Sequence, residues 1–357
     1  MPQINVAIIG VGNCASALVQ GVHYYGRGPK DKSIPGLLFT DFAGYYPNDI
    51  RFVAAFDVDT RKVGKNLGEA IFSKPNNTRK FAEVPRLDVE VMRGPVLDSI
   101  GEYVKSTIEI DDNQKVVDVA EVLKHTKANV ILNYLPVGSE KAARWYAEQA
   151  LKARCALVNC MPVFLASNSE WQEKFRRAGV PIAGDDVMGQ IGATVLHKSL
   201  ARLLVERGVL VDKSYQLNIG GDTDFLNMLE EERLKSKRIS KTGAVQAMVP
   251  YSVPLRIGPS DFVDFLQNKK ICYIWLEGRY FGDTPLRIDV KLDVWDAPNS
   301  GGVVIDVIRA VKLAIDRKIA GPLISISAYA FKTPPMQLSY ETAKQWVEEF
   351  IEGKRER

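Results

Sequence analysis

The chain contains 357 residues, which exceeds the roughly 100–200 residues of one typical domain, so we expect two domains. Its composition, 46% hydrophobic and 25% charged, is typical of a soluble globular protein with a substantial core. The net charge of +4 arises from basic and acidic residues that are mixed along the chain, and it gives no support to nucleic-acid binding.

No apolar stretch approaches the roughly 18 residues of a membrane span, and the N-terminus lacks the basic region of a secretory leader. The four cysteines have neither the spacing of a zinc site nor the density of a disulfide scaffold. We therefore expect a cytoplasmic protein with reduced thiols that binds no membrane.

Residues 4–20 carry the pattern of a dinucleotide-binding turn. An apolar strand runs directly into Gly10-x-Gly12-x-x-Ala15 and then into a helix. Gly10 permits a tight turn, Gly12 has no side chain to block a pyrophosphate, and Ala15 lets the helix pack closely on the strand. The free N–H groups of that helix would face the phosphates.

The next predicted strand, Arg51–Asp57, ends in an acidic residue. At this point a carboxylate accepts hydrogen bonds from an adenine ribose and repels a 2′-phosphate, so Asp57 favours NAD over NADP. Asp57 lies much farther from the glycine turn than the usual distance of about 20 residues, and we interpret residues 24–50 as an insertion. The alternative is that Asp57 only opens a turn that runs to Thr60.

Strands and helices then alternate along the chain. This alternation indicates a mostly parallel, doubly wound sheet, on which ligands bind outside the carboxyl ends of the strands. The predicted strands are 129–133, 156–159 and 181–183, and the predicted helices are 139–152, 168–178 and 193–207. The polar residues that follow the strands are candidates for the nicotinamide rim: Asn133 to Pro136, Asn159 to Pro162, and Gly184 to Asp186.

The pattern changes near residue 212. Apolar and charged residues alternate strictly from Pro285 to Val294, which is typical of a half-exposed antiparallel strand. Residues 270–281 are predicted to form its hairpin neighbour. The flat face of this second sheet is a candidate oligomer surface.

A helical pattern returns at Val303–Ile315, with Asn299 or Ser300 as its expected cap, and a strand is predicted at Leu323–Phe331. We therefore expect a doubly wound, Rossmann-type α/β fold with an inserted α+β domain of mainly antiparallel sheet. The expected division is a dinucleotide-binding domain at 1–211, a catalytic and oligomerisation domain at 212–298, and a return to the first domain at 299–357.

Histidine chemistry is poorly supported. His23, His125 and His197 fall in or beside predicted helices, with no matching carboxylate or nucleophile nearby in the sequence. A surface position or a satisfied core position is the ordinary interpretation of each. Lysine and carboxylate side chains would therefore have to carry any catalysis.

The richest polar cluster runs from Asn218 to Asn227 and is followed by the basic segment Lys235 to Lys241. In a helix, Lys237 and Lys241 would share one face. Two ammonium groups in one pocket suit a phosphate, and each lowers the pKa of the other toward useful proton transfer. The alternative is a solvated basic face with ordinary surface pairs.

Several segments, in this order along the chain, closely resemble motifs of the myo-inositol-1-phosphate synthase family, in its shorter bacterial and archaeal branch. The resemblance spans essentially the whole chain, and it is carried by residues 133–139, 183–186, 218–227, 235–241, 295–300 and 331–335. It implies a homotetramer that uses NAD to convert D-glucose 6-phosphate to 1D-myo-inositol 3-phosphate. In the implied reaction, oxidation at C5 permits enolisation at C6, aldol closure onto C1 and re-reduction.

The resemblance also implies the site residues. Lys237 and Lys332 would handle proton and charge at the C5 oxygen, while Lys270 and Lys241 would polarise the C1 carbonyl and hold the phosphate. Asp224, Asn218 and Asp222 complete the expected catalytic set. The expected cofactor-binding set is Gly10, Gly12, Asn13, Cys14, Ala15, Asp57, Asn133, Tyr134, Asp185, Asp186, Gly189, Asp224, Lys237 and Asp296.

Two positions depart from the family pattern. Gly189 stands where a serine is frequent, so only its backbone N–H could serve a phosphate or metal, and Asp222 stands where an amide is common. A divalent or monovalent cation is a further candidate cofactor, because carboxylate oxygens suit hard ions. Its candidate ligands are Asp185, Asp186, Asp222, Asp224 and Asp296.

Two other functions fit the same plan of domains. One is a conventional NAD-dependent dehydrogenase that releases reduced cofactor, and the other is an NAD-binding regulatory protein without turnover. The sequence does not determine whether residues 24–50 and 231–252 are ordered without a ligand.

Overall fold

A computed structural model describes residues 3–26 and 35–357. Its larger sheet is entirely parallel, with the strand order β11-β6-β5-β4-β1-β2-β3, which confirms the predicted doubly wound sheet. The strands are β1 (Ile4–Ile9), β2 (Ile50–Asp57), β3 (Val91–Arg93), β4 (Val130–Asn133), β5 (Ala156–Asn159), β6 (Pro181–Gly184) and β11 (Gly321–Pro322).

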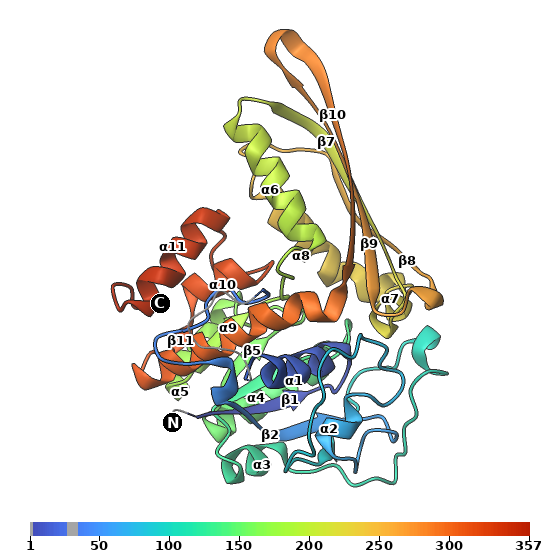
Figure 1. Ribbon diagram of the computed structural model, residues 1–357, viewed down its shortest axis with the longest axis vertical. Helices are drawn as coiled ribbons and strands as arrows, with labels where there is room; N and C mark the ends of the chain where they lie inside the picture. The colour runs from blue at the N-terminus through green and yellow to red at the C-terminus, as the bar shows by residue number, and fades with distance from the viewer. Residues whose placement is uncertain (1–2, 27–34) are drawn as a thin grey trace.

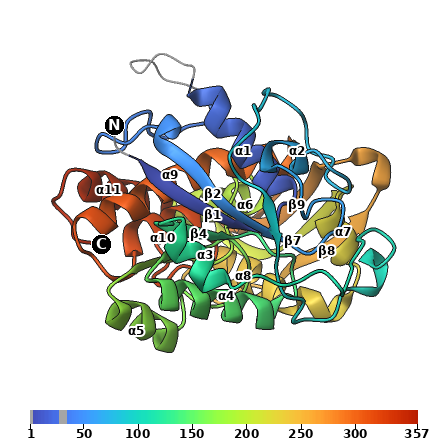
Figure 2. The ribbon, with the colours of Figure 1, turned by 90° about the horizontal axis from the view of Figure 1, so that it is seen from below.

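Helices cover both faces of this sheet, as Figure 2 shows from below. Successive residues of a strand point to opposite faces, so Ile8 of β1 packs in one core cluster and Ile9 in the other. On the Ile8 side lie α1 (Asn13–Tyr25), α9 (Asp296–Asp316), α10 (Ile324–Ala330) and α11 (Tyr340–Ile351). On the Ile9 side lie α3 (Val119–His125), α4 (Glu140–Ala153) and α5 (Ser169–Ala178).

A second sheet rises from this α/β body and ends in a long hairpin, at the top of Figure 1. Its strand order is β10-β9-β7-β8, in which β9 runs antiparallel to β10 and β7, and β8 runs parallel to β7. The expected mainly antiparallel sheet and its hairpin are confirmed. The elements are β7 (Leu210–Gly220), β8 (Leu255–Phe262), β9 (Lys269–Tyr280) and β10 (Thr284–Trp295), with α6 (Ala193–Glu206) and α8 (Lys235–Gln246) packed on one face.

The chain returns to the parallel sheet through α9, which packs beside α1, and through β11 at the sheet edge. The expected domain boundaries stay a prediction. The remaining short elements are α2 (Leu67–Ala70), α7 (Thr223–Asn227), η1 (Pro47–Asp49), η2 (Glu102–Val104), η3 (Glu231–Leu234), η4 (Asp264–Leu266) and η5 (Phe281–Asp283).

The strand predicted at Leu323–Phe331 is wrong, because most of this segment forms helix α10. Its alternating small polar and apolar residues resemble a strand, but Ser325 and Ser327 are as buried as Ile326, so the alternation does not separate an inner face from an outer one. The predicted cap of the preceding helix is also wrong. Helix α9 begins at Asp296, after Trp295, rather than at Asn299 or Ser300.

The predicted insertion lies partly outside the described residues, at positions 27–34. Of the described part, the backbone carbonyls of Phe39, Thr40 and Tyr45 accept hydrogen bonds from the buried Arg309 guanidinium of α9. Residues 231–252, whose order the sequence left open, include α8. None of the helices in the described part of the chain combines the length and apolar character of a membrane crossing.

Candidate active site

A cavity of about 330 Å³ lies where the carboxyl ends of the parallel strands meet the second sheet. Its lining begins at Asp57, at the end of β2, passes Gly10 and Gly12, and reaches Lys237 on α8. This is the position at which doubly wound sheets bind their ligands.

The glycine turn is built as the sequence predicts. Gly10 has a φ of +85°, and a Cβ on this residue would lie 2.6 Å from the Tyr134 carbonyl oxygen. A Cβ on Gly12, by contrast, would meet nothing within 4 Å. The turn therefore requires glycine at position 10, whereas Gly12 leaves open space in front of the first N–H groups of α1.

Asp57 lines the cavity and also holds the glycine turn. One of its carboxylate oxygens accepts the Val11 N–H at 2.7 Å, and the other accepts the N–H groups of Val58 at 2.7 Å and Asp59 at 2.9 Å. These contacts agree with the alternative interpretation from the sequence, in which Asp57 opens a turn. Contact with a cofactor ribose stays a prediction.

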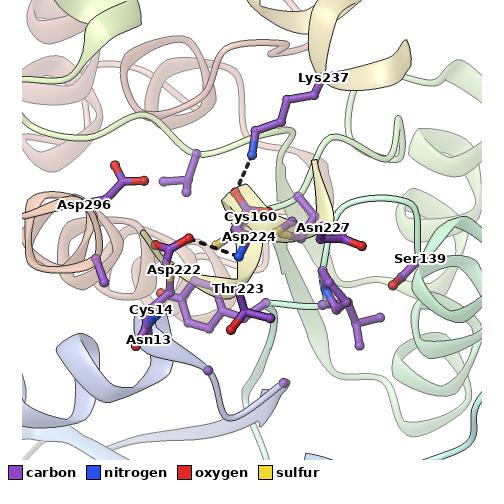
Figure 3. Close-up of a pocket in the computed structure, with 18 of the residues that line it drawn as sticks. Asn13, Cys14, Ser139, Cys160, Asp222, Thr223, Asp224, Asn227, Lys237 and Asp296 are labelled. Atoms are coloured by element: carbon purple, nitrogen blue, oxygen red, sulfur yellow. Dashed lines mark hydrogen bonds and ion pairs between the residues drawn. The ribbon is translucent and has the colours of Figure 1, made fainter. Parts of the chain in front are cut away.

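The four lysines that the resemblance implies all line this one cavity. Three of them are each paired with a different aspartate: Lys237 with Asp224 at 2.6 Å, Lys270 with Asp296 at 3.2 Å, and Lys332 with Asp186 at 2.7 Å. Lys241 has no carboxylate within 4.0 Å among the described residues. In Figure 3, Lys237 reaches from α8 toward Asp224, and Asn13 and Cys14 approach from α1.

The lysine pairs differ in their electrostatics. Burial acts to lower the pKa of Lys237, but the Asp224 carboxylate and its neighbours outweigh it, so this pKa is raised. The pKa of Lys270 is raised in the same way, because Asp296 outweighs burial. Burial lowers the pKa of Lys332, and Asp186 offsets this only in part.

Lys241 is the most strongly perturbed of the four amines. Burial, followed by the ammonium groups of Lys237, Lys270 and Lys332, holds the pKa of Lys241 well below its ordinary value. An amine in this setting either becomes neutral or takes up an anion that supplies the missing counter-charge.

Asp222 and Asp224 have different roles at the start of α7. One oxygen of Asp222 accepts hydrogen bonds from the backbone N–H groups of Asp224 at 3.0 Å and Phe225 at 3.1 Å. The other oxygen accepts a hydrogen bond from the side-chain amide of Asn268 at 2.5 Å. Burial, together with the nearby Asp224 carboxylate, raises the pKa of Asp222 to about 7. Asp222 thus caps the helix that positions Asp224, whose Oδ1 has no hydrogen-bond partner among the described residues.

The structure does not bring all the predicted residues to the cavity. Asp185 is fully buried and faces away: its carboxylate accepts hydrogen bonds from the Leu165, Ala166 and Ser167 N–H groups at 2.9–3.0 Å. Burial raises its pKa to about 6. Its assignment to cofactor binding is corrected, because both of its oxygens are engaged in holding the loop that follows β5.

Asn133, Asn218 and Ala15 are also buried outside the cavity lining. Asn133 donates to the Asn159 side chain at 2.8 Å, and its oxygen accepts the Leu135 N–H at 3.1 Å, so it shapes the turn after β4. Asn218 accepts from Gln216 on the same strand. Their direct contacts with ligands stay a prediction, and Ala15 is buried as its packing role requires.

The five candidate cation ligands do not converge. In the described ranges, no three His, Cys, Asp or Glu side chains are grouped so that they could hold a metal ion. Asp185 faces away from the cavity, and Asp186, Asp224 and Asp296 each hold a lysine. We therefore assign no step to a cation.

Gly189, the predicted departure from the family pattern, has a steric reason. A Cβ on this residue would lie 2.6 Å from the Asn299 side-chain nitrogen. Asn299 in turn accepts the Ile191 N–H at 3.1 Å and donates to the Ile191 carbonyl at 3.2 Å. Glycine at 189 thus leaves room for the amide that holds this wall of the cavity.

None of the three histidines lines the cavity. His197 is buried between Gln216 at 3.2 Å and Ser214 at 2.9 Å, and burial lowers its pKa to about 4. It is therefore a neutral, satisfied core histidine near pH 7, one of the two ordinary interpretations considered from the sequence.

Arg233 is a site residue that the sequence did not reveal. Its guanidinium lines the cavity, donates to the Ser99 carbonyl and to the Val137 carbonyl at 3.4 Å, and pairs with Glu230 at 2.6 Å. It thus joins three segments around the cavity that are far apart in the chain. Arg233 follows three glutamates in the sequence, Glu230 to Glu232, and such a charged segment is typical of a solvated surface. No local signal in the sequence therefore pointed to this role.

The fold and the cavity together define a Rossmann-type α/β protein with a lysine-lined site at the carboxyl edge of its sheet. Residues 192–297 match the family model described as myo-inositol-1-phosphate synthase. Inositol-3-phosphate synthase from Mycolicibacterium smegmatis is 52% identical, over 98% of both chains, and that from Corynebacterium glutamicum is 49% identical, also over 98% of both. The crystal structure of a myo-inositol-1-phosphate synthase-related protein from Thermotoga maritima is similar with a TM-score of 0.84 and 25% identity, over 98% of both chains.

The chain therefore belongs to the myo-inositol-1-phosphate synthase family. It is an enzyme of the isomerase class, of the intramolecular-lyase type. The resemblance stated from the sequence motifs is confirmed.

Proposed function

We propose that this enzyme converts D-glucose 6-phosphate to 1D-myo-inositol 3-phosphate with NAD, the first step of inositol biosynthesis. The observation that carries the proposal is one cavity that combines the glycine turn with four lysines, of which three are held by aspartates. The names of the relatives support the same product.

The cavity suits NAD at its glycine end. Gly12 leaves open space before the start of α1, and Asp57 stands where a ribose hydroxyl would be bound and a 2′-phosphate repelled. Bound NAD would supply the reversible hydride acceptor for C5. We assign NAD contacts to Gly10, Gly12, Asn13, Cys14, Asp57 and Tyr134 and, around the nicotinamide, to Asp186, Gly189, Asp224, Lys237 and Asp296.

We assign Lys332 and Lys237 to the C5 oxygen. The lowered pKa of Lys332 makes its neutral amine accessible, so it can accept the proton of the C5 hydroxyl during oxidation. The raised pKa of Lys237 keeps its ammonium charged, so it can stabilise negative charge that develops on the same oxygen. The C5 ketone then acidifies the hydrogen at C6, and the resulting enolate attacks C1.

We assign Lys270 and Lys241 to the other end of the sugar. Lys270, charged and held by Asp296, would polarise the C1 aldehyde for attack. Lys241 has no carboxylate partner among the described residues, and a substrate phosphate would supply the counter-charge. Asp224, held in place by the Asp222 cap, would orient Lys237.

The outer face of the second sheet supports a homotetramer. Tyr215, Leu217 and Tyr273 are all more than a third exposed there, and large exposed apolar patches mark interaction surfaces. Light scattering of the purified enzyme would test this assembly, and a monodisperse monomer would contradict it.

The experiment that tests the function is incubation with glucose 6-phosphate and a catalytic amount of NAD. We expect an acid-stable inositol phosphate to form without net production of NADH. The Lys237→Met variant serves as the control and should form no inositol phosphate. Steady accumulation of NADH would instead indicate a conventional dehydrogenase. Tight NAD binding without conversion of the sugar phosphate would indicate a regulatory protein.

A further inference from the structure

A chain of hydrogen bonds runs behind the lysine cluster. Ser240 Oγ donates to Asp186 Oδ2 at 2.7 Å, and Thr333 Oγ1 donates to Ser240 Oγ at 2.8 Å. The other Asp186 oxygen accepts from Lys332 Nζ at 2.7 Å. Ser240 is 2% exposed and Asp186 is 3% exposed, so both partners of this contact are buried.

This chain joins three separate parts of the fold. Asp186 follows β6, Thr333 follows α10, and Ser240 lies on α8 between the site residues Lys237 and Lys241. A single buried hydroxyl therefore links the helix that carries two of the cavity lysines to the carboxylate that holds a third.

The backbone of Asp186 is already held, so its remaining freedom lies in the side chain. Its N–H donates to the Met161 carbonyl at 3.1 Å, and its carbonyl accepts the Lys332 N–H at 2.8 Å. Without the Ser240 hydroxyl, Asp186 Oδ2 would be a buried acceptor without a hydrogen-bond donor. Lys241 lines the same cavity and has no carboxylate within 4.0 Å among the described residues, so it would attract this oxygen. The carboxylate would then turn away from its present arrangement.

We propose that Ser240 is a positioning residue of this active site: its hydroxyl, held by Thr333, keeps Asp186 oriented so that one carboxylate oxygen serves Lys332. This inference rests on the proposed function and adds to it a residue that touches neither substrate nor cofactor. The hydroxyl also sets how firmly Lys332 holds its proton. With its carboxylate held in place, Asp186 raises the pKa of Lys332 against the effect of burial, so Lys332 holds its proton more firmly than it would without this contact.

Ser240→Ala provides the test. Hydrogen bonds to charged groups correspond to about a 10- to 100-fold effect, so we expect kcat to fall at least tenfold. Because Asp186 raises the pKa of Lys332, loss of this orientation would lower that pKa, and the acid limb of the kcat–pH profile should move to lower pH. The KM for glucose 6-phosphate should stay within about twofold, since Ser240 does not line the cavity.

Three further variants complete the design. Ser240→Thr restores a hydroxyl and should recover most of the activity. Thr333→Val removes the donor to Ser240 without changing α8, and we expect a smaller shift of the acid limb in the same direction. Ser236→Ala, on the same helix but outside the cavity lining, is the matched control and should behave as the wild type.

An unchanged kcat and acid limb in Ser240→Ala would overturn the inference. So would equal losses of kcat, NAD affinity and unfolding temperature, because these would show a purely structural role. A wild type that forms no inositol phosphate would refute the proposed function and this inference together. An active wild type with an indifferent Ser240→Ala variant would refute this inference alone.

Discussion

Lys198 offers a test of the electrostatic reasoning that does not depend on catalysis. It lies on α6 and is fully buried, and its Nζ has no hydrogen-bond partner among the described residues. The nearest favourable contact is the ring of Tyr340, 4.7 Å from Nζ to the ring centroid. Burial lowers the pKa of Lys198 from 10.5 to about 8.

This lowered pKa has a cost in stability. One pKa unit corresponds to about 1.4 kcal/mol, so the charged Lys198 destabilises the folded state by about 3 kcal/mol at pH 7. Lys198→Met removes the charge, keeps a similar length and places a sulfur near the Tyr340 ring. After loss of the cation–π contact, worth about 1 kcal/mol, we expect a net gain of about 2 kcal/mol in the free energy of unfolding.

The gain should depend on pH with a defined sign. Between about pH 8 and 10.5 the unfolded chain binds a proton at this lysine that the folded chain does not. The stability that Lys198 costs the wild type is therefore recovered as the pH rises through this window. The advantage of Lys198→Met should be complete below about pH 8 and largely lost near pH 10.5.

Urea unfolding of both proteins at pH 7 and at pH 10 measures this difference. Lys344→Met is the matched control, because Lys344 is half exposed and pairs with Glu348 at 3.4 Å. Such surface pairs contribute less than about 1 kcal/mol. A Lys198→Met protein that is no more stable than the wild type at pH 7, or whose advantage does not decline with pH, would refute the reasoning.

Four other substitutions are expected to act on function. Lys332→Met and Lys237→Met should each abolish formation of inositol phosphate while the circular dichroism spectrum stays near that of the wild type. Substantial turnover would reject the assigned roles. Gly12→Val should leave the unfolding temperature within a few degrees of the wild type, since a Cβ at this position meets no neighbour within 4 Å. It should weaken NAD binding at least tenfold, because the side chain would occupy the space left for the pyrophosphate. Unchanged NAD affinity would place the phosphates elsewhere. Arg233→Ala should raise the NAD dissociation rate at least tenfold in stopped-flow fluorescence, because three segments around the cavity lose their common donor; an unchanged rate would contradict this role.

Adjacent residues show where sequence reasoning reached its limit. Asp185 and Asp186 follow the same strand and resemble one motif, yet Asp185 holds a buried loop while Asp186 holds Lys332. Both residues lie beyond the end of β6, and Asp186 has a positive φ of 62°, so the turn that follows the strand directs the two carboxylates differently, and residue spacing alone does not reveal this turn. The segment 323–331 shows the same limit. Its alternation of small polar and apolar residues is typical of a strand, but both kinds of residue are buried and the segment forms helix α10.

The sequence by itself determined those features that depend on neighbours along the chain. The glycine turn, the alternation of strands and helices, the hairpin of β9 and β10, and the shared helical face of Lys237 and Lys241 all follow from local backbone geometry and short periodicities. Tertiary structure alone decided which aspartate holds which lysine, and that Lys241 has no such partner among the described residues. It also decided that Arg233 contacts a residue more than 100 positions away in the chain, and that Ser240 contacts one more than 50 positions away. The physical reason is that charge pairing and burial act over a few ångströms in space, and nothing in the spacing of residues along the chain encodes which distant side chains will meet.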